Sequence, residues 1–205
     1  MQLFETMRLE AGEIPRETYH RQRMARSAEA LGYPFSTIQW QQVLAEMQRT
    51  YAHGLHRLKV VLSATGTLTV EVGTLADKPY MTARLVQIDD HTPQWQRINK
   101  TSERTFLQHN HQTDIVLFHD AHGRVLEFDI GNLVIVSNGE YFTPRYRNDF
   151  LRGCMRQALL DNGEIKEADI TTEMLTQAIE KHDKIWMINS LREWVPVYFQ
   201  QGCEK

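Results

Sequence analysis

The stretch from Gly123 to Arg156 constrains the fold of this chain more than any other segment. It begins with two apolar strands, and Glu127 lies inside the first, where a charge is costly unless a cation or a protonated nitrogen faces it. Asn132 follows a glycine at the turn into the second strand, which covers residues 133–136. A polar loop then leads into a helix near residues 151–160, and backbone amides at such a helix start suit a phosphate. The stretch therefore indicates a ligand that carries both a phosphate and a basic ring nitrogen.

Composition excludes several classes of protein. The chain has 205 residues, 41% of them apolar, which is enough for one large domain or two small ones. Its net charge of -3, with acidic and basic residues interspersed, predicts no nucleic-acid partner. No apolar run approaches the roughly 18 residues that span a bilayer, and the N-terminal residues lack a signal-peptide pattern. We therefore expect a cytoplasmic protein with a small-molecule partner and no membrane partner. Cys154 and Cys203 match neither a disulfide framework nor a metal motif, so we expect reduced thiols and no metal.

Hydrophobic periodicity predicts an α/β chain with two lobes. In the small α/β lobe, residues 1–88, we expect a strand, a helix ending before Gly32, a second helix with Ser36 as its N-cap, and three further strands. Residues 89–99 are polar, contain Pro93 and show neither period, so we expect a connector. In the larger lobe, residues 100–205, we expect a short helix over 100–111, a strand over 114–120, the opening stretch, a helix over 172–180 and two final strands.

A lysine would be needed to hold the reactive carbon of such a ligand, since it is the side chain that forms a Schiff base. The chain has seven lysines, and five of them lie in charged helix ends, turns or the C-terminus. Lys59 alternates with apolar residues on a strand, and Lys100 directly follows the connector, where we expect a cleft. Most lysines are solvated surface groups, so position alone leaves both candidates open.

Several segments in a fixed order resemble the class IV aminotransferases, the fold-type IV pyridoxal-phosphate enzymes. The segments are KTSERTF, then DIVLFHDAHGRVLEFDIGNLVIV, then YFTPRYRNDFLRGCMRQALL, then MINSLREWVPV, and FETMRLEAGEI with HRQRMARSAEALG extends the likeness to nearly the whole chain. The resemblance implies a two-lobed architecture with the cofactor, pyridoxal 5'-phosphate, in the cleft between the lobes. It also implies an amino substrate, a homodimer, and either transamination or elimination of pyruvate from 4-amino-4-deoxychorismate.

The resemblance assigns roles to individual residues. Lys100 is the implied Schiff-base lysine, and its freed amine would move the α-proton of the substrate. Glu127 matches the acid that faces the pyridine nitrogen and keeps it protonated. Arg23 matches the arginine that reaches the phosphate, with bidentate geometry as the physical advantage over lysine.

Further positions match the family at the phosphate and the substrate. The backbone amides near Gly153, Cys154 and Met155 correspond to a second phosphate contact, and Asn189 with Ser190 to a third, although a strand-end Asn-Ser is also common turn chemistry. Asn132 implies a structural or cofactor-orienting role. Arg57 and Lys59 could meet a substrate carboxylate, and a solvated strand face is an equally good interpretation.

The chain departs from the family pattern in three places. It starts almost at FET, without the usual preceding strand and glycine-rich run, which could leave the pocket unusually open. ATG replaces a common arginine-glycine after RLKVVLS, and Thr105 stands where transaminases often have tyrosine, a departure also seen in the lyase branch.

Two alternatives stay open at this point. One is a degenerate relative that binds the cofactor or a similar ligand without turnover. The other is a metal site on His109, His111, His119 and His122, but no cysteine or acid completes a known pattern, so we expect surface histidines.

Overall fold

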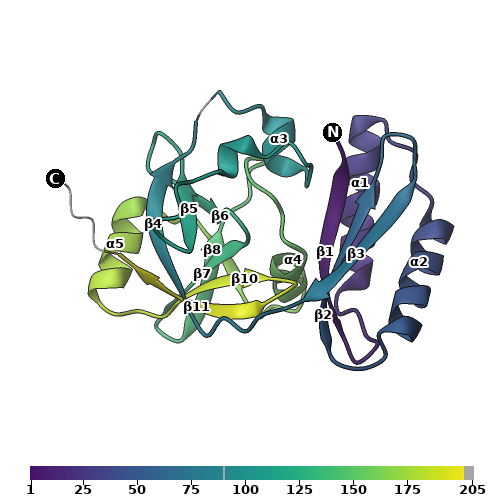
Figure 1. Cartoon of the computed structure of the whole chain (residues 1–205). Coiled ribbons are helices and arrows are strands. Elements are labelled where there is room, and N and C mark those ends of the chain that lie inside the picture. The colour runs from purple at the N-terminus through teal and green to yellow at the C-terminus, as the bar shows by residue number, and fades with distance from the viewer. Residues whose placement is uncertain (90, 201–205) are drawn as a thin grey trace. The chain divides into compact units, whose positions relative to one another are not determined.

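The computed structural model describes residues 1–89 and 91–200, and Figure 1 shows the order of its elements along the chain. The chain divides into two compact units. The first consists of residues 1–77 together with 99–103, and the second of residues 78–98 together with the chain from residue 104 onward. The observed architecture is a mixed α/β fold, as predicted.

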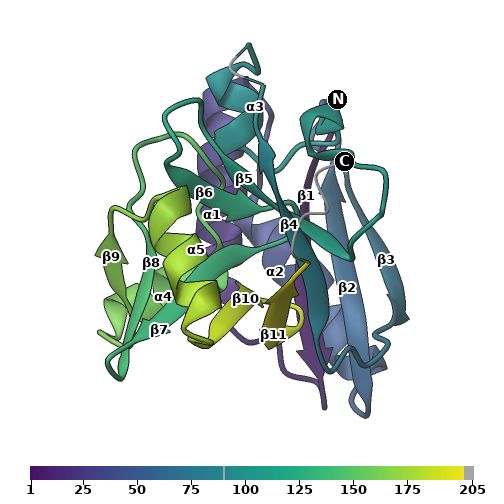
Figure 2. The same cartoon turned by 90° about the vertical axis from the view of Figure 1, so that its left-hand side faces the viewer.

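The first unit is a three-stranded antiparallel sheet in the order β1-β2-β3, with two helices on one face (Figures 1 and 2). The strands are β1 (Leu3–Glu10), β2 (Leu55–Leu62) and β3 (Leu68–Thr74), and the helices are α1 (Glu17–Leu31) and α2 (Thr37–Thr50). Helix α1 ends at Gly32, whose φ of 72° is left-handed, and the Ser36 hydroxyl accepts the amide of Gln39 at the start of α2. These predicted helix boundaries are therefore confirmed.

Buried and more exposed side chains alternate along β1 and so mark the two faces of this sheet. Leu3, Met7 and Leu9 are buried against the helices, where Trp40 of α2 is fully enclosed. Phe4, Thr6 and Arg8 lie on the opposite face and are half-buried. The odd-numbered position between Leu3 and Met7 is Glu5, a carboxylate that points into the apolar side.

Residues 99–103 return the chain to the first unit. The Phe4 amide donates to the Lys100 carbonyl at 3.0 Å, and Leu3 forms a bridge with Thr101. The segment thus adds to the edge of β1, and the helix predicted over 100–111 is wrong. Only a short 3-10 turn, η1 (Thr105–Leu107), forms there, and the predicted connector contains the short helix α3 (Gln94–Ile98).

The second unit contains an eight-stranded mixed sheet in the order β6-β5-β4-β11-β10-β7-β8-β9. Its strands are β4 (Met81–Gln87), β5 (Ile115–His119), β6 (Val125–Phe128), β7 (Asn132–Ser137), β8 (Glu140–Pro144), β9 (Lys166–Ala168), β10 (Ile185–Asn189) and β11 (Glu193–Phe199). Strand β4 pairs in parallel with β5 and β11, so it belongs here and not to the predicted small lobe of residues 1–88. The predicted boundary at 89–99 accordingly does not coincide with this division.

Besides α3 and η1, the second unit contains α4 (Cys154–Asp161) and α5 (Thr172–Glu180). Helix α5 has its predicted bounds, whereas α4 starts at Cys154, later than expected. Strands β6 and β7 follow one another in the sequence and are joined by a short turn that a bridge between Phe128 and Gly131 closes. In the hydrogen-bonded order of the sheet, however, four other strands lie between β6 and β7. The sheet must therefore curl, and this brings Glu127 and Asn132 to neighbouring positions.

The main apolar core of the second unit fills the inside of this curl and includes Leu117, Phe128, Leu133 and Met187. Its buried residues come mainly from β4, β5, β6, β7, β10 and β11 and from helix α5. No helix among the described residues is long and apolar enough to cross a membrane.

Candidate active site

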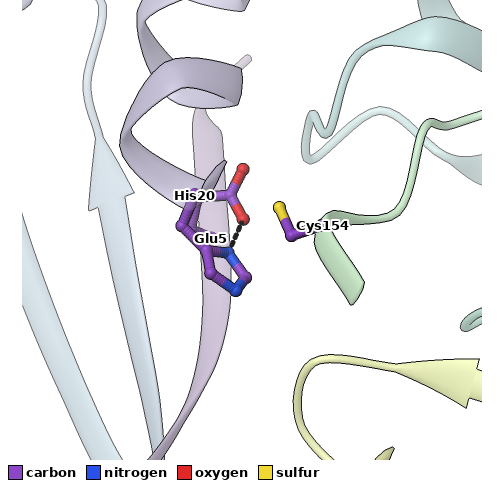
Figure 3. Close-up of side chains that lie close together, drawn as sticks. All are labelled: Glu5, His20 and Cys154. Atoms are coloured by element: carbon purple, nitrogen blue, oxygen red, sulfur yellow. Dashed lines mark hydrogen bonds and ion pairs between the residues drawn. The ribbon is translucent and has the colours of Figure 1, made fainter. Parts of the chain in front are cut away.

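A buried cluster of charged and polar side chains lies under the sheet of the first unit. Glu5 is 1% exposed and accepts two hydrogen bonds from Arg23, from Nε at 2.8 Å and from Nη2 at 2.6 Å. Its Oε2 is also 2.7 Å from Nδ1 of His20, a contact drawn in Figure 3. Arg23 and His20 are three residues apart on α1, so both reach the same carboxylate. Arg23, the predicted phosphate arginine, is thus held at two guanidinium nitrogens.

Electrostatics in this cluster favour the ionised carboxylate. Burial alone would raise the pKa of the Glu5 carboxyl, but the charge and hydrogen bonds of Arg23, with a smaller contribution from His20, lower that pKa to about 2. Glu5 is therefore an anion at neutral pH, and the guanidinium of Arg23 is a compensated buried charge.

Lys100 lies on the opposite face of the same sheet. Its Nζ is 5.0 Å from the centre of the Phe4 ring, and the Nζ of Lys59 is 5.6 Å from the centre of the same ring. Lys59 also forms an ion pair of 3.1 Å with Glu71 across β2 and β3. The guanidinium of Arg57 lies against Gly73 of β3. Both lysines singled out by sequence, and the predicted substrate residues, therefore share one sheet face.

Glu127 and Asn132 contact the backbone of one residue of the second unit, Leu151. The carboxylate oxygen Oε1 of Glu127 accepts the amide of Leu151 at 3.0 Å, and Nδ2 of Asn132 donates to the carbonyl of Leu151 at 3.2 Å. Glu127 is 5% exposed and Asn132 is 2% exposed. Glu127, predicted from the strand pattern to be a buried acid, is confirmed as buried. Its hydrogen-bond partner, the Leu151 amide, lies in the loop that leads to α4.

Helix α4 starts directly after this loop. Gly153 is its N-cap, with φ of -64° and ψ of 138°, and a Cβ at this position would lie 2.0 Å from Oδ1 of Asn132. No side chain other than hydrogen fits there. Cys154 and Met155 are buried, so at these positions only the backbone amides are suited to a ligand. Cys154 is a free thiol, and Cys203 lies outside the described residues.

Asn189 stands beside this cluster because Ile188 of β10 pairs with Asn132 of β7. Its Nδ2 donates to the carbonyl of Ile130 at 3.0 Å, and its Oδ1 accepts the amides of Leu191 and Arg192 at 3.0 and 2.7 Å. The Asn189 side chain therefore organises the turn between β10 and β11, as turn chemistry alone would predict. Ser190 follows it and is buried.

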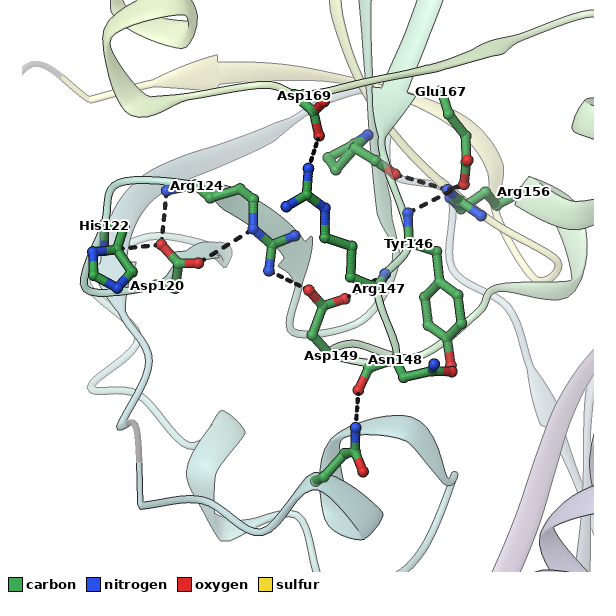
Figure 4. A network of polar contacts seen from close by, with 12 residues as sticks. Asp120, His122, Arg124, Tyr146, Arg147, Asn148, Asp149, Arg156, Glu167 and Asp169 are labelled. Carbon is green, nitrogen blue, oxygen red and sulfur yellow. Dashed lines mark hydrogen bonds and ion pairs between the residues drawn. The ribbon is translucent and has the colours of Figure 1, made fainter.

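Ion pairs hold the chain between β8 and α4 in place (Figure 4). Arg124 pairs with both Asp120 and Asp149, and Arg147 reaches Asp169 at 2.7 Å. Arg156 of α4 is 1% exposed and links the two ends of the loop. It donates to the carbonyl of Pro144, the last residue of β8, at 2.7 Å and to Glu167 at 2.6 Å. The loop that precedes α4 is thus bound by Arg124, which directly precedes β6, and by Asp169, which directly follows β9.

The histidines considered as metal ligands differ in their surroundings. His111 and His122 are exposed, as expected, and His119 is half-buried. The expectation of a surface group is wrong for His109, whose side chain is 5% exposed and whose Nε2 lies 3.4 Å from Oδ2 of Asp129. Burial raises the pKa of Asp129 against the opposing effect of the Val116 amide and of His109.

Sequence reasoning missed Glu5, His20 and the Leu151 peptide. A signal existed for Glu5, because FETMRLE places it in register with the buried Leu3 and Met7, where a charge requires a partner. No residue pattern marks Leu151, since its backbone groups make the contacts.

Comparison with known proteins places these features in a family. The family model described as Amino-transferase class IV matches residues 2–198. A provisionally assigned aminodeoxychorismate lyase from Schizosaccharomyces pombe is 29% identical, and the match covers 93% of this chain and 86% of that protein.

Two solved structures show the same fold. A provisionally assigned amino-acid aminotransferase from Mesorhizobium loti is 27% identical with a TM-score of 0.81, and the match covers 97% of this chain and 99% of that one. A provisionally assigned 4-amino-4-deoxychorismate lyase from Haemophilus somnus is 25% identical with a TM-score of 0.78, covering 94% and 97%. Enzymes of this family use pyridoxal 5'-phosphate. With a family match over nearly its whole length and this fold, the chain belongs to the class IV aminotransferases, a family of pyridoxal-phosphate-dependent enzymes.

Proposed function

We propose that this protein eliminates pyruvate from 4-amino-4-deoxychorismate, with Lys100 as the lysine that holds the cofactor. The observation that supports a cofactor role is the hydrogen bond from the Leu151 amide to buried Glu127, two residues before Gly153, the N-cap of α4. A carboxylate suited to a ring nitrogen is thereby linked to a helix start whose amides suit a phosphate.

The residues present fit pyridoxal 5'-phosphate. Gly153 leaves no side chain over the start of α4, and a Cβ there would fill space that Asn132 already limits. In the first unit, Glu5 binds Nε and Nη2 of buried Arg23 and fixes its orientation, so a phosphate contact of Arg23 would come from Nη1 and would not be bidentate through Nε and Nη2. When bound, the cofactor supplies an electron sink for the substrate carbanion.

Each protein group then has a defined task. Lys100 would hold the cofactor and, once released, carry a proton at Nζ to or from the substrate. Glu127 would keep the ring nitrogen protonated, and Asn132 would orient the segment around it. The backbone near Gly153, Cys154 and Met155 would hold the phosphate together with Arg23, and Asn189 with Ser190 would add a further contact. Lys59 and Arg57 would meet a substrate carboxylate.

The lyase reaction is favoured over transamination by Thr105 and by the two relatives that carry a lyase assignment. Loss of pyruvate from the substrate ring leaves an aromatic amine, so the reaction needs no amino acceptor. Transamination is the second candidate, because the Mesorhizobium loti relative is assigned as an amino-acid aminotransferase. Binding of the cofactor without turnover is the outcome expected if neither reaction occurs.

Addition of pyridoxal 5'-phosphate to the purified protein tests the cofactor assignment. We expect visible absorbance from the lysine-bound cofactor in the wild type and in Lys59→Ala, and its loss in Lys100→Ala. Lys59 is a matched control because both ammonium groups approach the same Phe4 ring. Equal spectra for the wild type and Lys100→Ala would refute the role of Lys100.

Turnover separates the reactions. Pyruvate released from 4-amino-4-deoxychorismate without an added keto acid supports the lyase, whereas keto acid formed only with an amino donor and an acceptor supports transamination. The homodimer and the cytoplasmic location stay predictions, which light scattering and cell fractionation would test.

A further inference from the structure

Glu127 and Asn132 share a task that the family roles do not include. Both side chains come from the short hairpin β6–β7, and both end on the peptide groups of Leu151, one at its N–H and the other at its C=O. Leu151 is itself 6% exposed. We call Glu127, Asn132 and the backbone N–H and C=O of Leu151 the Leu151 clamp.

The clamp reaches the start of α4 through Asn132. While its Nδ2 donates to Leu151, its Oδ1 occupies the space that a side chain at position 153 would need. One amide group therefore bonds the loop at one residue and limits it at the N-cap of the helix. The direction of the first amides of α4 follows from these two contacts, because only Arg152 separates Leu151 from Gly153.

Burial makes these contacts specific. A buried hydrogen bond that is lost leaves its backbone partner unsatisfied, since little water can replace it. The carboxylate of Glu127 uses Oε1 for the Leu151 amide. A glutamine at position 127 would keep such an acceptor, whereas an alanine would not. Both substitutions remove the negative charge of Glu127, but only the alanine also removes the acceptor for the Leu151 amide.

We propose that Glu127 and Asn132 are positioning residues for the cofactor's phosphate. By fixing Leu151 and Gly153, they set the direction of the first backbone amides of α4. Glu127, expected at the ring nitrogen, would thus also affect how tightly the phosphate is bound. This inference rests on the proposed cofactor role of the site. It predicts that phosphate affinity depends on both side chains even though neither donates to the phosphate.

The test uses the full-length protein and four variants: Glu127→Gln, Glu127→Ala, Asn132→Ala and Thr113→Val. Thr113 is the matched control, because its buried hydroxyl donates to the carbonyl of Ile115 at 2.7 Å in the same unit, away from the loop. Hydrogen–deuterium exchange of peptides covering residues 151–157 is measured without cofactor. Dissociation constants are then measured for pyridoxal 5'-phosphate and for pyridoxal, which lacks the phosphate.

We expect the amides of 151–157 to exchange about tenfold faster in Glu127→Ala and Asn132→Ala, and the preference for pyridoxal 5'-phosphate over pyridoxal to fall by about the same factor. Glu127→Gln and Thr113→Val should stay within about twofold of the wild type in both measurements. A merely structural defect would weaken both ligands equally and leave the preference unchanged.

Two results overturn the inference while leaving the proposed function intact: unchanged exchange in both alanine variants, or equal loss of affinity for the two ligands. If Glu127→Ala does not fold, the contrast between Asn132→Ala and Thr113→Val decides the question in the same way. A wild type that binds neither ligand would instead refute the proposed function, and the phosphate role of the clamp with it.

Discussion

Replacing Glu5 by glutamine removes the negative charge that compensates buried Arg23 while nearly preserving the shape of the side chain. The pKa of Glu5 is lowered from 4.5 to about 2, and each pKa unit corresponds to about 1.36 kcal/mol. The ionised carboxylate therefore contributes about 3 kcal/mol to folding at pH 7, which agrees with the cost of about 3–5 kcal/mol for breaking a buried ion pair. We expect Glu5→Gln to lose a stabilisation of this size.

The sign of the pH dependence follows from the lowered pKa. The contribution is fully present above the unfolded value of 4.5 and is lost as the pH falls through about 2. The difference in unfolding free energy between the wild type and Glu5→Gln should accordingly shrink from about 3 kcal/mol at pH 7 to about 1.4 kcal/mol at pH 3.

Urea unfolding at pH 7, 5, 4 and 3, followed by circular dichroism, measures this difference. Glu10→Gln is the matched control, since Glu10 lies on the same strand and pairs with Arg8 at 2.8 Å but is exposed. Its unfolding midpoint should stay close to that of the wild type. Equal destabilisation by the two substitutions, or a difference for Glu5→Gln that does not change with pH, would refute the reasoning.

Three other substitutions test the packing and the site. Gly153→Ala should destabilise the protein by about 1–3 kcal/mol through overpacking against Asn132, and combining it with Asn132→Ala should cost less than the sum of the two; additive costs in urea unfolding would contradict the contact. Trp40→Ala removes a fully buried ring and should cost about 3–5 kcal/mol in the same assay, and a loss below about 1 kcal/mol would argue against its burial. Lys59→Gln should raise KM about tenfold with a smaller change in kcat. Glu71→Gln, which releases Lys59 from its ion pair, should not raise KM. Equal KM values for the wild type and Lys59→Gln would refute the role of Lys59 in binding a substrate carboxylate.

Periodic patterns predicted the long elements of the fold and failed for segments whose structure depends on distant partners. The helix over 172–180 could be predicted from its own apolar spacing, and the helix end at Gly32 from the residue type, since glycine readily takes the left-handed backbone that ends a helix. Strand β9 has three residues and exists because it pairs with β8, a tertiary contact without a local signature. The prediction for 100–111 failed for the same reason, because the backbone of Lys100 and Thr101 pairs with β1 and does not form helical hydrogen bonds.

The candidate site shows the same division. Glu127 could be predicted to be buried, because a charge stands inside an apolar strand. Its hydrogen bond to the Leu151 amide could not, because any residue offers that backbone group. The roles of Lys100 and Arg23 came from the family resemblance and stay predictions. The partners of Arg23 could have been expected from Glu5, whose in-facing position was overlooked.

The return of residues 99–103 to the first unit determines when Lys100, the proposed cofactor lysine, reaches its place during folding. Gln2 and Ser102 are hydrogen-bonded although 100 residues separate them, and the backbone of Lys100 is bonded to Phe4 beside them. Such a contact closes a long loop and forms slowly compared with local structure. Lysine-bound cofactor would then appear only in molecules whose strand β1 has been joined by this distant segment. The growth of its absorbance during refolding would report the closure of this loop.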